Sequence, residues 1–225
     1  MRVRVLTWNL KHGRSVPGSG RDLFAEFCSA LRGWDWQVAL LQEVPPWWPP
    51  MLADGLGAAE RHVLTSRNSL LSLRRTIATR WPDAIKSNGG GCNAILVRSG
   101  SISWHRARRL SVLPERRWVH AVGLGDVCVA NLHVGASPRQ ARLAAATAAH
   151  WAGRSKVILG GDFNLPLLSL DGFRWAGGYG VDHVYVRGMG RPVSETRVLD
   201  GGHLSDHAPV LVTVTPPAPS STRSP

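Results

Sequence analysis

The stretch Lys156-Val157-Ile158-Leu159-Gly160-Gly161-Asp162-Phe163-Asn164 is a short apolar run that ends in a carboxylate and an amide. A run of this length, bounded by glycine, is typical of a buried strand. Polar side chains that end such a strand are held by a rigid scaffold, where proteins commonly place residues that act on a ligand. The stretch therefore indicates a sheet-based fold with a candidate site at one sheet edge.

Four other segments repeat this design of an apolar strand next to a polar cluster. They are Thr7-Trp8-Asn9, Leu41-Gln42-Glu43, Asn131-Leu132-His133 and Ser205-Asp206-His207, the last of which precedes its strand. A single cluster of this kind is also compatible with an ordinary turn, because Asp, Asn and Gly are common turn residues. Its repetition along the chain favours one shared site.

The rest of the chain contains many strand patterns and few helix patterns. Helices are predicted at 22–31 and, from the capping residues Ser137, Pro138 and Gln140, up to about 152. Strands are predicted at 3–8, 37–41, 92–98, 102–110, 118–122, 127–132, 156–160, 181–186 and 210–214. A glycine-rich turn is expected at 88–91, and 61–88 is poorly patterned. This balance favours two packed sheets covered by helices over a single doubly wound sheet.

The proline-rich stretch Pro45-Pro46-Trp47-Trp48-Pro49-Pro50 cannot continue a strand, and we expect a stiff loop there. Its two tryptophans either stack on bases or lipid, or cover a hydrophobic patch. Lone histidines such as His62, His105 and His120 are expected at the surface or as satisfied core residues.

The chain is strongly basic, with 27 Lys and Arg against 15 Asp and Glu and a net charge of +12. Such a charge attracts polyanions, so nucleic acid is the first partner to consider. Only three of the basic residues are lysines, and a GC-rich coding sequence also produces an arginine bias. Charge alone therefore leaves the partner open.

Length and composition predict one folded domain over residues 1–215 and a disordered proline- and serine-rich tail over 216–225. The three cysteines are widely spaced and form no CxxC pair, so disulfides and structural zinc are not expected. The sequence has no secretion-signal pattern and no membrane-spanning apolar run. We expect a cytoplasmic protein without stable membrane association, and its oligomeric state stays open.

Gly161-Asp162-Phe163-Asn164 and Ser205-Asp206-His207, supported by Trp8-Asn9 and Gln42-Glu43, give the sequence a recognisable pattern. It resembles the endonuclease/exonuclease/phosphatase superfamily, whose members have a deoxyribonuclease-I-like fold. The resemblance runs from Thr7 to Val210. It implies an α/β fold, a four-layer α/β/β/α sandwich, with the site at one edge of the two sheets.

Phosphodiester hydrolysis needs a bound cation, an activated water and donors to the phosphate. We expect Mg²⁺, which Mn²⁺ can replace, with Glu43 as principal ligand and Asn9 and Asp206 nearby. Asp162 is the candidate to orient and deprotonate water, and Asn164, two residues along, is expected to point to the same side and help place water and phosphate.

Two histidines complete the expected site. The resemblance implies that Asp182 fixes the tautomer of His207, which donates to the phosphate. His133 is expected to stabilise the phosphate or to protonate the leaving group. Candidate substrate contacts are Asn131, Trp47 and Trp48. Nucleases of this family often have a further acid before the His133 position, but Glu60 and Glu115, the only glutamates in the interval, lie in no recognisable motif.

The chemistry is better defined than the substrate. A nuclease that cleaves DNA or RNA ranks first because the chain is basic. The alternative is a lipid or small-molecule phosphodiesterase or phosphatase with the same core. A catalytically inactive nucleic-acid-binding module ranks third, since every main catalytic residue type is present.

Overall fold

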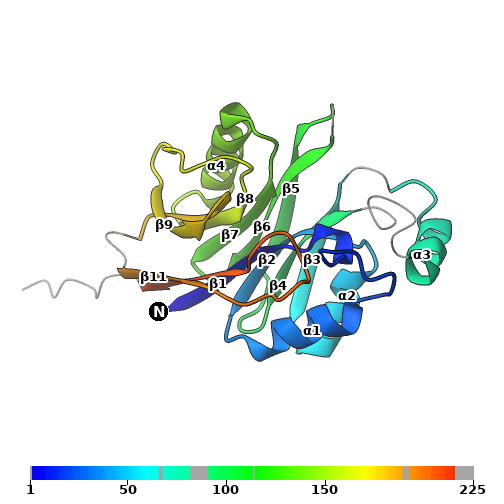
Figure 1. Cartoon of the computed structure of the whole chain (residues 1–225). Coiled ribbons are helices and arrows are strands. Elements are labelled where there is room, and N and C mark those ends of the chain that lie inside the picture. The colour runs from blue at the N-terminus through cyan, green and yellow to red at the C-terminus, as the bar shows by residue number, and fades with distance from the viewer. Residues whose placement is uncertain (1, 66–67, 82–90, 114, 190–192, 216–225) are drawn as a thin grey trace, which may run out of the picture.

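The computed structural model describes residues 2–65, 68–81, 91–113, 115–189 and 193–215. Two six-stranded sheets pack face to face, with helices on their outer sides (Figure 1). This arrangement confirms the predicted four-layer α/β/β/α sandwich. The predicted tail at 216–225 and residues 88–90 of the predicted turn lie outside the described residues.

The first sheet has the strand order β11-β12-β1-β2-β4-β3, and the second has the order β5-β6-β7-β8-β10-β9. The strands of the first sheet are β1 (Val3–Asn9), β2 (Val38–Val44), β3 (Ala59–Leu64), β4 (Cys92–Val97), β11 (Val193–Val198) and β12 (Val210–Thr215). Those of the second are β5 (Trp104–Ser111), β6 (Arg117–Leu124), β7 (Val127–His133), β8 (Lys156–Asp162), β9 (Arg174–Tyr179) and β10 (Asp182–Arg187).

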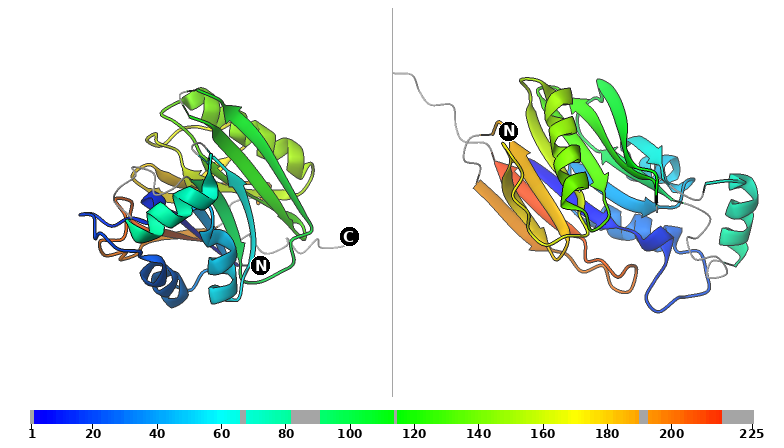
Figure 2. Two further views of the ribbon diagram at one scale, coloured as in Figure 1. Left: turned by 90° about the vertical axis from the view of Figure 1, so that its right-hand side faces the viewer. Right: turned by 90° about the horizontal axis from the view of Figure 1, so that it is seen from above.

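Helices α1 (Phe24–Gly33) and α2 (Trp48–Leu56) cover the first sheet, and α4 (Pro138–Ala152) covers the second. Helix α3 (Leu71–Arg80) projects from one end of the sandwich (Figure 2). The capping prediction for α4 is confirmed, because the Ser137 side chain accepts a hydrogen bond from the Gln140 N–H at 3.4 Å.

Three apolar layers hold the sandwich together. The layer between the sheets contains Val5, Leu40, Val129 and Ile158, which alternate with residues facing the helices. The layer under α1 and α2 is rich in aromatic residues, and the layer under α4 is rich in alanine. The central strands of each sheet are therefore buried on both faces, so they can hold end-of-strand side chains in fixed positions.

Strand direction brings the candidate site residues to one edge. β1 and β2 are parallel at the centre of the first sheet, as are β7 and β8 in the second. Asn9, Glu43, His133 and Asp162 thus lie at the carboxyl ends of four strands that end at the same edge. The antiparallel neighbours β10 and β12 begin there, with Asp182 opposite Asp162 and Val210 opposite Thr7.

The structure corrects one prediction for the first half of the chain and adds two elements that the sequence did not predict. The stiff loop predicted at 45–50 is wrong, because α2 begins at Trp48 and Pro49 lies in its first turn. Proline is favoured there, since the first N–H groups of a helix have no intrahelical partner to lose. The poorly patterned stretch contains β3 and α3, whose weak apolar periodicity gave no prediction.

Candidate active site

The Asp162 carboxylate lies at the centre of the site and is 1% exposed. Its Oδ1 accepts from the Asn164 backbone N–H at 2.8 Å, and its Oδ2 accepts from Asn9 Nδ2 at 2.9 Å. The ring nitrogens His133 Nε2 and His207 Nε2 lie 3.5 and 3.9 Å from the same Oδ2. Side chains from three other strand ends thus surround one buried carboxylate oxygen.

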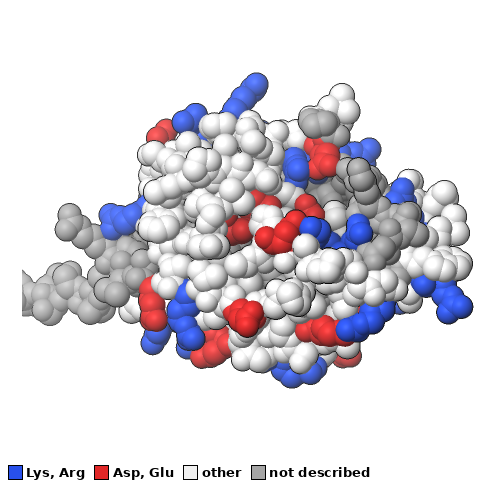
Figure 3. All heavy atoms as spheres, viewed as in Figure 1, with Lys and Arg blue, Asp and Glu red and all other residues white. Residues whose placement is uncertain are grey.

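Glu43 lies beside Asp162 and is held as an anion. Burial alone would raise its pKa, but the hydrogen bond from His12, the charges of His12 and His133, and the Asn9 amide lower that pKa to about 2. His12 Nε2 lies 3.1 Å from Glu43 Oε2, and His133 Nε2 lies 3.9 Å from Oε1. On the face of the molecule that Figure 3 shows, atoms of acidic residues gather near the middle, with atoms of basic residues beside them.

His207 and Asp182 form a hydrogen-bonded pair, as expected from the resemblance. His207 Nδ1 donates to Asp182 Oδ2 at 2.7 Å. This hydrogen bond raises the pKa of His207 to about 9. The negative charges of Asp182, Asp162 and Asp206 act in the same direction, whereas burial opposes the shift. The imidazole is therefore protonated at neutral pH, with its Nε2–H directed towards the Asp162 side.

His133 differs in its electrostatics from His207. Burial and the positive charge of Arg117 lower the pKa of His133 to about 4, although the negative charges of Asp162 and Glu43 oppose this shift. Arg117 Nη1 donates to His133 Nε2 at 2.5 Å, and Glu115 holds Arg117 through an ion pair of 2.7 Å. A neutral His133 is a poor proton source for a leaving group. Arg117 is a site residue that the sequence reasoning missed, because it lies in no motif.

Asp206 is the most exposed of the three predicted metal-binding residues. Lys11 Nζ lies 2.6 Å from its Oδ2. Asn9 is buried, and both polar atoms of its side-chain amide are hydrogen-bonded. Asn9 Oδ1 accepts from the Lys11 N–H at 2.9 Å, and Nδ2 donates to Asp162. The structure thus gathers Glu43 and Asn9 around Asp162 and ties Asp206 to Lys11.

Asn164 follows β8 and does not extend it. Its φ of 49° places it in the left-handed region, so the strand alternation behind its predicted direction does not apply. Its Nδ2 donates to the Val134 carbonyl at 3.0 Å, which fixes the turn. The Asn164 backbone N–H contributes to the site by holding the Asp162 carboxylate.

Backbone strain is concentrated at this edge. Among the described residues outside glycine, five have positive φ, and four of them are Lys11, His12, Glu43 and Asn164. Such conformations persist where the surrounding structure enforces them, and they cluster at functional sites. The strain supports this edge as the functional one.

Asn131 and Trp48 are both buried, which argues against their predicted role as substrate contacts. Asn131 is fully buried, and its Nδ2 donates to the Leu41 and Ala94 carbonyls, both at 2.9 Å. It therefore joins the two sheets behind the site. Trp48 is 1% exposed and packs edge-on against Phe24. It serves the core, while the half-buried Trp47 lines a groove with α3.

Another group of possible metal ligands is Asp162, Asp182 and His207, whose ligand atoms lie within 4.8 Å of one another. His207 Nδ1 is already bonded to Asp182, and a protonated imidazole has no lone pair for a metal. Glu43, ionised and partly exposed, is the better cation ligand. Its carboxylate is the hard oxygen donor that Mg²⁺ and Mn²⁺ prefer.

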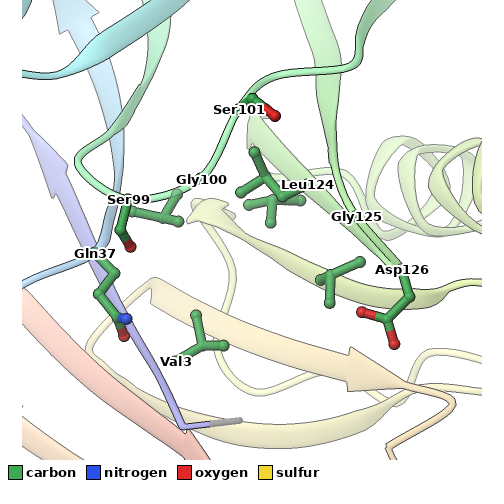
Figure 4. Close-up of a pocket in the computed structure, with 11 residues that line it drawn as sticks. Val3, Gln37, Ser99, Gly100, Ser101, Leu124, Gly125 and Asp126 are labelled. Carbon is green, nitrogen blue, oxygen red and sulfur yellow. The ribbon is translucent and has the colours of Figure 1, made fainter.

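A separate cavity of about 330 Å³ lies between the sheets at the opposite edge (Figure 4). Val3, Val38 and Val127, at the beginnings of three strands, line it with Leu124. Its one carboxylate, Asp126, is paired with Lys156 at 2.7 Å. None of the candidate catalytic residues reaches this cavity.

The fold and the polar edge define a two-sheet sandwich of the kind found in phosphoester hydrolases. The family model for the endonuclease/exonuclease/phosphatase family matches residues 6–207, and the chain belongs to this family. Its members are generally hydrolytic and depend on divalent metal ions. No curated protein matches the chain.

Solved structures share the fold at low sequence identity. An endonuclease/exonuclease/phosphatase from Beutenbergia cavernae is 18% identical with a TM-score of 0.67, over 95% of this chain and 71% of that one. Truncated TDP2 from Caenorhabditis elegans is 15% identical with a TM-score of 0.66, over 95% and 97%. A Bacteroides vulgatus member is 14% identical with a TM-score of 0.70, over 96% and 100%.

A helix that crosses a bilayer must be both long and predominantly apolar. Among the described helices, none combines the length and the apolar composition needed to cross a bilayer.

Proposed function

We propose that this protein is a Mg²⁺- or Mn²⁺-dependent phosphodiester hydrolase that cleaves nucleic acid. The observation that carries the proposal is the Asp162 carboxylate, which is fixed by Asn9 and the Asn164 N–H and faces two histidines of opposite protonation. A buried carboxylate in this setting is suited to orient a water and accept its proton.

The side chains of the chain divide the chemistry between them. Asp162 accepts a proton from the attacking water as the new oxygen–phosphorus bond forms. His207, held by Asp182, donates a hydrogen bond to a phosphoryl oxygen and offsets its negative charge. Arg117, placed by His133 and Glu115, adds a second cationic donor. The bond to the leaving oxygen breaks, and that oxygen takes a proton from solvent.

Glu43 is the principal residue that would hold the cation, with Asn9 beside it and Asp206 as the outermost carboxylate. The donor set fits a hard divalent ion, because it consists of carboxylate and amide oxygens and Glu43 is ionised at neutral pH. When bound, the ion supplies positive charge to the phosphate and acidity to coordinated water.

The surroundings of the site support a polyanionic substrate. The ends of β3 and β4 where Leu64 pairs with Cys92 lie at the site edge, so α3, inserted between these strands, belongs to the same end of the molecule. Helix α3 carries Arg74, Arg75 and Arg80 and no acidic residue. Trp47 shares a groove with its first turn. Arginine and a half-exposed indole suit a nucleic acid strand.

A lipid phosphodiester is the second candidate, and one observation favours it. Leu73 and Trp81 of the α3 region are 57% and 60% exposed beside the arginines. Exposed apolar and basic side chains on one short helix also suit a membrane surface. The two substrates require different assays, so one set of measurements can separate them.

The test is turnover by purified metal-free protein, with and without added Mg²⁺ or Mn²⁺, on plasmid DNA, RNA, abasic duplex, phosphoinositide and sphingomyelin liposomes. We expect activity on nucleic acid that appears only with a divalent ion and that a chelator abolishes. Asp162→Asn serves as the inactive control. Full turnover without any divalent ion would overturn the mechanism, and turnover confined to liposomes would overturn the substrate.

A further inference from the structure

The turn after β1 brings an imidazole to the predicted metal ligand. Its residues Lys11, His12 and Gly13 have φ values of 46°, 56° and 74°, three consecutive left-handed conformations. Asn9 Oδ1 caps the turn through the Lys11 N–H at 2.9 Å, and Gly13 N donates to the Leu10 carbonyl at 2.8 Å. The chain therefore reverses sharply, and the His12 side chain returns to Glu43.

Packing on both sides fixes the turn. A Cβ at Gly13 would lie 2.5 Å from the ring of the buried Trp48, so only glycine fits there. On the other side, a Cβ at Gly91 would lie 3.1 Å from His12 Cε1, so the imidazole rests directly on that glycine. The side chain of His12 has little freedom to move away from Glu43.

The distance between the two side chains suits a shared ion. His12 Nε2 lies 3.1 Å from Glu43 Oε2. Two ligands about 2.1 Å from an octahedral ion, at right angles to each other, are about 3.0 Å apart. An ion could therefore be bound by both atoms with little rearrangement of either side chain.

We propose that His12 is a nitrogen ligand of the divalent ion, next to Glu43, and that it makes the site select Mn²⁺ over Mg²⁺. The inference rests on the proposed metal-dependent function of the same site. Mg²⁺ strongly prefers oxygen ligands, whereas imidazole suits first-row transition ions. A mixed oxygen and nitrogen donor set thus favours the transition ion.

The competing role for His12 is an ion-pair partner of Glu43 that leaves when the ion binds. The two roles predict opposite effects of removing the imidazole. A ligand's loss weakens Mn²⁺ binding, whereas the loss of a competitor leaves the affinity unchanged or raises it. His12→Asn is the suitable variant, because asparagine tolerates the left-handed region and its shorter side chain does not reach Glu43 in the same way.

The experiment measures Mn²⁺ binding to the full chain without substrate. Free Mn²⁺ is titrated by electron paramagnetic resonance, and pulsed measurements on protein with ¹⁵N-labelled histidine detect a coordinated imidazole nitrogen. We expect a nitrogen coupling in wild type, its loss in His12→Asn, and a roughly tenfold or larger drop in Mn²⁺ affinity with a smaller drop for Mg²⁺ in competition.

Two further variants keep the result interpretable. His62→Asn is the matched control, because His62 makes a similar contact with Glu60, at 2.9 Å, away from the site, and it should bind Mn²⁺ like wild type. Gly91→Ala presses on the His12 ring without removing it and should weaken the coupling.

Each outcome decides the matter. No coupling in wild type, or a coupling that persists in His12→Asn, shows that the nitrogen is not His12 and overturns the inference while leaving a metal-dependent hydrolase intact. Failure of the wild-type chain to bind any divalent ion overturns the proposed function as well.

Discussion

Asp162 is the residue whose role can be tested most directly. Asp162→Asn keeps the hydrogen-bond acceptor that faces the Asn164 N–H but removes the base, so the fold should persist. We expect kcat to fall by roughly 10²-fold or more, within the usual contribution of about 10²–10⁴ from a general base. Glu43→Gln should weaken metal affinity as well as rate. Wild-type turnover by either variant, at an unchanged unfolding midpoint, would show that the roles are wrongly assigned.

His207 and Asp182 should act as one unit, since their 2.7 Å hydrogen bond holds the proton on the imidazole. Asp182→Asn should lower the rate by about 10 to 100-fold, as the loss of a carboxylate behind a histidine commonly does. In a double-mutant cycle with His207→Ala, the combined loss should be much smaller than the product of the single losses. Independent, multiplicative losses would contradict the pair.

Some site residues could be identified from the sequence and others could not, and the two groups differ in which part of the backbone brings them to the site. Asp162, Glu43 and His207 stand at strand ends inside short motifs, so their meeting follows from strand direction. His12 and Arg117 reach the site through a left-handed turn and through contact with His133, and no local pattern encodes either contact. Asn131 lies two residues before His133 on the same face of β7, but its fully buried side chain joins the two sheets behind the site.

At the scale of elements, the start of α2 places two neighbouring tryptophans in different surroundings, Trp48 in the core and Trp47 half-buried at the surface. Trp48→Ala should destabilise the fold by roughly 3–5 kcal/mol, because it leaves a cavity against Phe24 and Gly13. Trp47→Ala should cost little stability but, if Trp47 stacks on a base, about 1–3 kcal/mol of single-strand affinity. Urea unfolding and single-strand binding measure both effects. Equal stability losses in the two variants would contradict this division.

Helix α3 should bind phosphate groups through its arginines. Replacing Arg75 and Arg80, both exposed, with glutamine should weaken nucleic acid binding and flatten its salt dependence, by about 0.7–0.9 in log–log slope for each phosphate that is no longer bound. Turnover of a small chromogenic phosphodiester should not change. Arg154, an exposed arginine after α4, is the control for charge alone. A slope that changes equally with Arg154→Gln would argue against a specific role for α3.

The elements were predictable from sequence where one physical signal dominated. Helix α4 has a serine cap, a proline at its first position and an alanine-rich body, so propensity and packing agree. Helix α2 was missed because its prolines suggested a loop, although they also suit a first helical turn. Strand β3 and helix α3 bury few side chains of their own, and they therefore have little apolar pattern.

On the scale of the whole molecule, the space between the sheets contains a buried histidine. His120 is fully buried, and burial, aided by the charges of His105 and His62, lowers its pKa well below the usual value. Its Nδ1 faces His105 Nε2 at 3.3 Å, and its Nε2 has no partner among the described residues. The expectation of a satisfied core histidine is therefore only half correct.

The folded state excludes protonated His120, whereas the unfolded chain takes up the proton near pH 6.5. The contribution of His120 to the free energy of unfolding should therefore be largest above about pH 6.5 and fall as the pH drops below it, by up to about 1.4 kcal/mol per pH unit for one proton. Half-buried His105, whose pKa is lowered by burial and by the charge of Arg61, with Glu60 opposing, adds to the same trend.

Urea unfolding between pH 7.5 and 5 measures this slope. His120→Asn should flatten it, whereas His150→Asn, at an exposed position of α4, should leave it unchanged. An identical slope in wild type and His120→Asn would show that His120 does not titrate on unfolding.

The pairing of β1 with β12 sets the order in which the molecule can be completed during its synthesis. Strand β1 lies between β2 and β12, and Trp8 Nε1 donates to the His207 carbonyl at 2.9 Å. Ribosomes add roughly 5–20 residues per second, so about 10–40 s separate the synthesis of β1 from that of its partner. Until then a central strand lacks one neighbour and the candidate site lacks His207, so the site can be complete only after the last strand of the first sheet has been made.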